Sequence, residues 1–302
     1  MKVRVVHSSE IDIGGHDPDL APKNYAQLAL AEGDSWFSLG GVPAGNILYQ
    51  LDFPQKTMVV NIADPGDTLM KDIGNKDNMD ELRRLVTQRR YGFKWKFILL
   101  SGGGNDLIDG AQSVLRTDNL ASTVAADYVD ADALKKLMNQ VQTDIASIVE
   151  MRDSTDYNRG TPIFTHTYDY PTPNNSPTRV LGVPRGKAWL SRDFAKANIP
   201  AAMWPAVSDY LIEHLAKSIL ALDCRGLDDS CPTPLPDCKP LPDFYVVNTL
   251  GTLVRAAPDS TAGSGDWLNE IHPGISGNRK LARKLAAEIQ RMLAERQVDA
   301  TA

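Results

Sequence analysis

Short apolar runs alternate with longer amphipathic stretches along most of the 302-residue chain. Five runs are short, rich in apolar or β-branched residues and bounded by Gly, Asp, Asn or Ser, a pattern that predicts strands. These runs are residues 27–32, 57–62, 96–100, 161–167 and 243–248. Four longer stretches place their apolar residues on one face of a helix. They are residues 80–90, 130–151, 205–222 and 278–295.

Strands separated by helices of this length predict an α/β protein with a parallel sheet covered by helices on both faces. Residues 1–25 are polar and aperiodic, and we interpret them as an N-terminal arm or wrapping segment before a single domain over 26–302. Two proline-rich stretches, at about 170–200 and 223–242, interrupt the alternation, which resumes after each of them. We therefore expect loop insertions there rather than linkers.

Composition excludes some classes of function. Hydrophobic residues make up 42% and charged residues 23%, as in an ordinary globular domain. The net charge is −6 and no basic stripe is present, so a nucleic-acid partner is not expected. No apolar signal region or transmembrane segment stands out, which makes a cytoplasmic location the default. A secreted or periplasmic protein whose leader lies outside this sequence would show the same pattern.

The three cysteines, Cys224, Cys231 and Cys238, are spaced seven residues apart in one predicted loop. A zinc site needs a fourth ligand, and no His or further Cys lies nearby in the sequence, which disfavours a metal. A single disulfide with one thiol left over and three unpaired thiols both remain open.

Candidate chemistry appears where the predicted strands end. Ligands of an open parallel sheet bind outside the carboxyl ends of its strands. A hydroxyl, a glycine, a side-chain amide and an imidazole follow strands or precede the last helix, and acyl transfer needs such a set. The segments are Gly33-Asp34-Ser35-Trp36, Asp64-Pro65-Gly66-Asp67, Gly102-Gly103-Gly104-Asn105-Asp106 and Asn269-Glu270-Ile271-His272-Pro273.

In this order, and over the span from Ser35 to Pro273, the four segments resemble the blocks of the SGNH (GDSL-type) hydrolase superfamily. The resemblance implies a three-layer α/β/α fold with a five-stranded parallel sheet in flavodoxin-like order. It also implies hydrolysis of a carboxylic ester of a small molecule, with no metal or organic cofactor.

The same resemblance implies roles for individual residues. Ser35 is the expected nucleophile, and His272 is the expected general base and acid. The N–H groups of Ser35 and Gly66 and the amide of Asn105 form the expected oxyanion hole. A glycine suits position 66 because a Cβ there could obstruct the approach of the substrate oxygen.

One position departs from the family pattern. The family places Asp three residues before the catalytic His, whereas this chain has Asn269. An amide oxygen can orient the imidazole but carries no full negative charge, and in serine proteases an acid-to-amide change costs about 10⁴ in turnover. Three interpretations remain open: Asn269 orients His272, Asp266 reaches in, or the site works as a Ser–His dyad.

Several alternatives stand beside this hypothesis. Ser35 could simply cap a helix, and His166, at the end of the fourth predicted strand, could border the pocket. With the same site the enzyme could be a carbohydrate O-acetylesterase or a lipolytic enzyme of the (lyso)phospholipase type. A catalytically lapsed ligand-binding protein is the rival from another class, and Asn269 is the feature that supports it. The α/β-hydrolase elbow is excluded because Phe37 replaces its last glycine.

Overall fold

All five expected strands are present in the computed structural model, each within two residues of its expected limits. They are β2 (Gln27–Gly33), β3 (Thr57–Asn61), β4 (Phe97–Ser101), β5 (Ile163–His166) and β8 (Phe244–Val247). The structure describes residues 1–39, 45–69, 76–89, 93–118, 121–174, 179–180, 183–184, 188–226 and 239–299.

The sheet is parallel and has six strands in the described residues, in the order β1-β3-β2-β4-β5-β8. Without β1 the order in chain numbering is 2-1-3-4-5, which is the flavodoxin arrangement expected. The expected count of five strands was wrong, because β1 (Arg4–His7) pairs with β3 at the edge. It was missed because only Val6 of its four residues is buried, so it lacks a strand-like apolar run.

The four expected helices form as α4 (Lys76–Thr87), α6 (Ala131–Asp153), α8 (Trp204–Leu220) and α9 (Ile275–Asp299). Shorter helices follow some strands or lie in connections. They are α1 (Ser35–Ser38), α2 (Ile47–Gln50), α5 (Gly104–Val114) and α7 (Leu190–Lys196), with a two-residue ribbon of β6 (Arg179–Val180) and β7 (Val183–Pro184). Within the described ranges no helix is long and apolar enough to span a bilayer.

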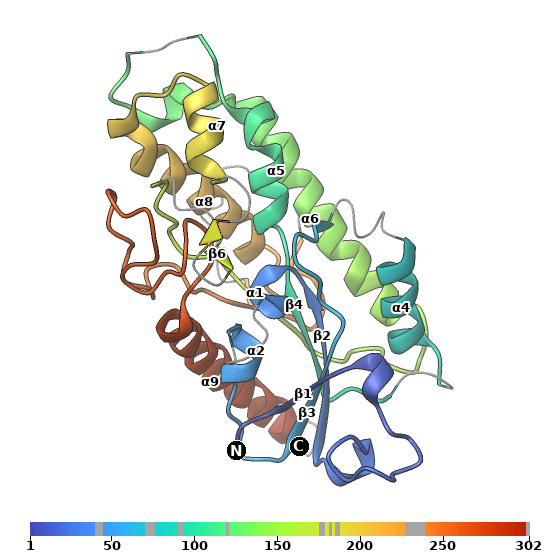
Figure 1. Cartoon of the computed structure of the whole chain (residues 1–302). Helices are drawn as coiled ribbons and strands as arrows, with labels where there is room; N and C mark the ends of the chain where they lie inside the picture. Colours follow the sequence, from blue (N-terminus) through green and yellow to red (C-terminus); the bar gives the residue numbers. More distant parts are fainter. Residues whose placement is uncertain are drawn as a thin grey trace.

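The arrangement of the helices around the sheet determines where the site lies. Helices α4 and α6 cover one face of the sheet, and α2 and α9 cover the other (Figure 1). Strand β4 is buried along its whole length, as expected of a parallel strand covered on both faces. Helices α5, α7 and α8 contact one another at the end of the sheet where α1 begins (Figure 1). The carboxyl ends of the strands therefore face a group of helices.

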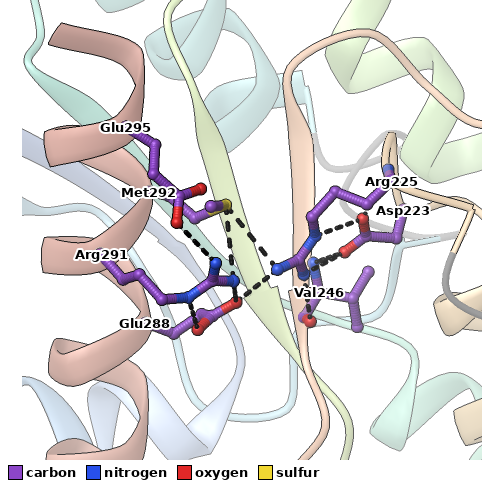
Figure 2. Close-up of polar contacts among 7 residues, drawn as sticks. All are labelled: Asp223, Arg225, Val246, Glu288, Arg291, Met292 and Glu295. Carbon is purple, nitrogen blue, oxygen red and sulfur yellow. Dashed lines mark hydrogen bonds and ion pairs between the residues drawn. The ribbon is translucent and has the colours of Figure 1, made fainter. Parts of the chain in front are cut away.

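A polar network ties α9 to β8 (Figure 2). The fully buried carboxylate of Asp223 accepts the Val246 N–H at 2.6 Å and two bonds from the Arg225 guanidinium. Arg225 also contacts Glu288 on α9, and Glu288 pairs with Arg291 at 2.7 Å. This network holds the helix that follows the His272 loop against the sheet.

Cys224 lies beside this network and is a free thiol. The other two cysteines, Cys231 and Cys238, lie outside the described residues. The choice between a single disulfide and unpaired thiols therefore stays a sequence-based prediction.

Replacing Asp223 should destabilise the fold more than any other change in this network. We expect Asp223→Ala to lower the free energy of unfolding by about 2–3 kcal/mol, because a buried N–H and a guanidinium lose their charged acceptor. Glu295→Ala is the matched control, since Glu295 pairs with Arg291 where both side chains are about half exposed and such pairs contribute at most about 1 kcal/mol. Urea unfolding of the two variants measures the difference, and equal losses would contradict the assignment.

Candidate active site

Ser35 is presented by the turn that joins β2 to α1. Gly33, the last residue of β2, has φ +142°, and a Cβ there would lie 2.2 Å from the carbonyl oxygen of Ser101 on β4. Only glycine fits this close approach. Asp34 caps α1 by accepting the Trp36 N–H at 3.0 Å. Capping thus falls to Asp34, and the Ser35 hydroxyl is available for another partner.

That partner is His272. The Ser35 Oγ lies 2.8 Å from His272 Nε2, although 237 positions separate the two residues in the chain. Both side chains are about 95% buried. His272 Nδ1 in turn lies 3.0 Å from Asn269 Oδ1. The structure therefore brings the expected nucleophile, base and orienting amide into one hydrogen-bonded chain.

Three donors fix the orientation of the Asn269 amide. Its Oδ1 accepts the backbone N–H groups of Ile271 and His272, at 3.1 and 2.9 Å, in addition to His272 Nδ1. Backbone N–H groups only donate, so the oxygen of the amide faces the imidazole and Nδ1 carries a proton. In the neutral ring Nε2 is then the acceptor that faces the Ser35 hydroxyl. The amide selects the tautomer that a carboxylate selects in a serine protease.

Burial keeps the imidazole neutral. It lowers the pKa of His272 to about 4, and the described hydrogen-bond partners of the ring, Asn269 and Ser35, are both uncharged. Asp266, the alternative acid, is engaged elsewhere: its carboxylate accepts the Val254 N–H at 2.7 Å and pairs with Lys280 on α9. Of the three interpretations, this geometry favours Asn269 as the group that orients His272.

The expected oxyanion donors lie on three segments: the start of α1, which carries Ser35, the turn that carries Gly66, and the start of α5, which carries Asn105. Asp64-Pro65-Gly66-Asp67 has Pro at its second position and Gly, with φ +90°, at its third, as a type II turn requires. A Cβ at Gly66 would meet no atom of the described residues within 4 Å, so within the protein it is the positive φ that favours glycine. The expected obstruction of the substrate oxygen by a Cβ stays a prediction.

Asn105, the second residue of α5, reaches this turn with its side chain. Its Nδ2 donates to the carbonyl oxygen of Asp67 at 2.8 Å. Because that oxygen can only accept, the bond identifies the nitrogen of the amide, and its second N–H remains for a ligand. Asn105 and Ser35 line the same pocket.

A buried network supports the nucleophile turn from beneath. The Asp34 carboxylate accepts hydrogen bonds from Ser101 Oγ, at 2.7 Å, and from the Tyr168 hydroxyl. Burial raises the pKa of Asp34 to about 6. His166 lies 3.1 Å from Ser101 Oγ and stacks on Trp36 with ring centroids 5.4 Å apart. His166 thus packs behind Trp36 and is not among the residues that line the pocket.

Glu270 is a residue whose role the sequence did not reveal. Its buried carboxylate accepts the N–H groups of Trp189, Leu190 and Ser191, at 2.6 to 3.0 Å, where α7 begins. The Trp189 ring meets His272 edge to face, with centroids 5.4 Å apart. Glu270 therefore links the His272 loop to the insertion at about 170–200. Its position between Asn269 and His272 could have drawn attention to Glu270. Its partners lie about 80 positions away in the chain, so the sequence could not identify them.

A pocket opens beside Ser35. It encloses about 520 Å³ of free space, with the solvent in its mouth included. Trp36 and Trp267 lie in its wall. The remaining lining residues are Asp34, Ser35, Gly104, Asn105, Leu107, Ile108, Tyr168, Asp169, Pro171, Leu190, Ser208, Leu211, Ile212 and Ile271. In the described part of the chain, no three His, Cys, Asp or Glu side chains gather as a metal site.

Comparisons with known proteins add a distant likeness. No family model and no curated protein sequence matches the chain. Similar solved structures include the acetylxylan esterase Axe2 from Geobacillus stearothermophilus, with 14% identity, coverage of 87% of this chain and 94% of that one, and a TM-score of 0.39. A possible lipase from Chitinophaga pinensis has 13% identity, coverage of 88% and 98%, and a TM-score of 0.43. Likeness at this level carries no argument about function.

The uncharged surroundings of His272 lead to a prediction about the pKa of its ring, which a pH titration can test. We expect its ring to titrate near pH 4 by NMR, as burial lowers its pKa to about 4. Asn269→Asp should raise that pKa, because a carboxylate beside Nδ1 stabilises the imidazolium. His166, whose pKa burial also lowers to about 4, is the internal control and should not move. A wild-type His272 that titrates near the ordinary 6.5 would contradict the neutral site.

Proposed function

We propose that this protein is a serine ester hydrolase that cleaves a carboxylic ester through an acyl-Ser35 intermediate. One observation carries the proposal: Ser35 Oγ, His272 Nε2 and Asn269 Oδ1 form a continuous hydrogen-bonded chain at a pocket that Asn105 also lines. A nucleophile within reach of a base, with the base held by a third group, is the arrangement that acyl transfer requires.

In the first half of the reaction, Ser35 Oγ attacks the ester carbonyl carbon and its proton passes to His272 Nε2. The carbonyl oxygen becomes an oxyanion that accepts the N–H groups of Ser35, Gly66 and Asn105. The carbon–oxygen bond to the alcohol then breaks, and Nε2 gives its proton to the departing oxygen. Ser35 is left as an ester of the acid.

In the second half, water attacks the acyl-Ser35 carbonyl carbon and gives a proton to His272 Nε2. The same donors stabilise the second oxyanion. The bond from the acyl carbon to Ser35 Oγ breaks, and Oγ recovers the proton from Nε2. The carboxylic acid leaves, and the site returns to its starting state.

Asn269 affects the charged intermediate in two ways. Its fixed oxygen selects the productive tautomer, so the tautomer part of the loss seen on acid-to-amide exchange in serine proteases does not arise here. It supplies a dipole rather than a full charge to the imidazolium that forms. Burial lowers the pKa of His272 to about 4, which leaves the ring neutral and able to accept a proton at neutral pH.

Removing the nucleophile tests the proposal directly. Ser35→Ala should abolish turnover of p-nitrophenyl acetate while the circular dichroism spectrum stays unchanged, because the hydroxyl takes part in the chemistry and not in the fold. Wild-type protein should also react with a fluorophosphonate probe, and peptide mapping should place the adduct on Ser35. Retained turnover in the variant would refute the proposal. Folded wild-type protein that does not react would instead favour the lapsed binding protein.

The amide of Asn105 should contribute to the transition state. Asn105→Ala should lower kcat by about 10²–10³, as for other oxyanion donors, with a much smaller change in KM. The lost bond to Asp67 removes on the order of 1 kcal/mol of stability, which thermal unfolding measures separately. An unchanged kcat in a folded variant would remove Asn105 from the oxyanion hole.

A further inference from the structure

We propose that the pocket beside Ser35 binds the acyl group of the ester and takes a short aliphatic chain of about four to six carbons, so that the enzyme prefers such esters to acetates. This inference rests on the proposed ester hydrolysis and adds the class of acid that is released. It depends on three features of the pocket: the chemistry of its wall, its position relative to His272, and its size.

The wall of the pocket is aliphatic and aromatic. Leu107 of α5, Leu211 and Ile212 of α8 and Leu190 of α7 supply its sides, and these three helices contact one another at this end of the sheet (Figure 1). Trp267 is buried and also faces the space. A wall of this kind stabilises an apolar chain by removing it from water.

Most of the polar groups in the wall already have partners within the protein. Asp169 accepts the N–H groups of Gly251 and Leu253, at 2.8 and 2.7 Å. The Ser208 hydroxyl lies 3.4 Å from the carbonyl oxygen of Pro171. The Tyr168 hydroxyl donates to Asp34. A sugar ring in this space would lose water contacts from its hydroxyl groups and gain few in return, which disfavours a carbohydrate.

The position of the pocket assigns it to the acyl side. Ser35 and Asn105 line the pocket, whereas His272 does not. The departing alcohol takes its proton from His272 Nε2, so the alcohol must lie on the imidazole side of Ser35. The substituent on the other side of the carbonyl carbon is the acyl chain, and it extends into the pocket.

The size of the pocket sets the length of the chain. The figure of about 520 Å³ counts all free space up to the open mouth, whereas only about 40 Å³ is open to the centre of a water-sized sphere. A single water needs roughly 10–15 Å³ by that measure, so the enclosed part holds about three waters. A methylene group is of similar size to a water, so the pocket takes about three methylene groups beyond an acetyl methyl. The expected optimum is near butanoate or hexanoate.

A series of p-nitrophenyl esters tests the length. With acetate, butanoate, hexanoate, octanoate and dodecanoate, each corrected for its rate without enzyme, kcat/KM should rise roughly fourfold for each methylene that the pocket buries. It should stop rising near hexanoate and fall for octanoate and dodecanoate. A profile that is highest at acetate would overturn the inference.

Variants at Ile212 test the location. Ile212→Ala should move the optimum to longer chains, because it deepens the pocket, and Ile212→Phe should move it to shorter ones. Ile219→Ala is the matched control: Ile219 is buried on the same helix, two turns further along, and does not line the pocket. It should lower stability without changing the profile. Unchanged profiles in folded Ile212 variants would place the acyl chain elsewhere, and if they do not fold, the wild-type series alone decides.

The fluorophosphonate reaction separates this inference from the proposed function. Labelling at Ser35 together with turnover highest for acetate would uphold the hydrolase and reject the acyl pocket. Absence of both labelling and turnover with every ester would reject both. Labelling with an optimum at butanoate or hexanoate is the result we expect.

Discussion

One oxygen atom organises the site. Asn269 Oδ1 accepts three N–H groups, two from the backbone of its own loop and one from the imidazole of His272. The two backbone bonds hold the amide in place, and the third sets which ring nitrogen carries the proton. A carboxylate could accept the same three bonds and would add charge. The amide therefore orients the ring as a carboxylate at this position would, without adding a negative charge.

The topology of the sheet explains why the other site residues lie close together. Residues separated by more than 200 positions meet because parallel strands end at the same edge, and each site residue follows such an end or precedes the last helix. Glycine at position 33 lets β2 and β4 approach closely at that edge. Helix α9, anchored to β8 through the Asp223 network, holds the end of the His272 loop (Figure 2). The local backbone geometry at Gly33 and the long-range packing of α9 thus both help to position the site residues.

The sequence predicts the repeating part of this structure well. Strand and helix periodicity identify five strands and four helices, since buried parallel strands read as apolar runs. Strand β1 was not predicted because an edge strand needs little apolar surface. Helix α5 was not predicted because it begins in a glycine run. The residues at strand ends are predictable from position. The bonds of Asp34 to Tyr168 and of Glu270 to α7 are not, because their partners are set by three-dimensional packing.

The link through Glu270 also bears on how this protein can change. A single carboxylate joins the backbone of the insertion to the loop that carries the imidazole. Exchanging the insertion for that of another protein, a common route to new selectivity, would leave that buried charge without its three donors unless position 270 changed as well. A chimera of this protein would therefore need both segments from one parent, or a matching change at position 270.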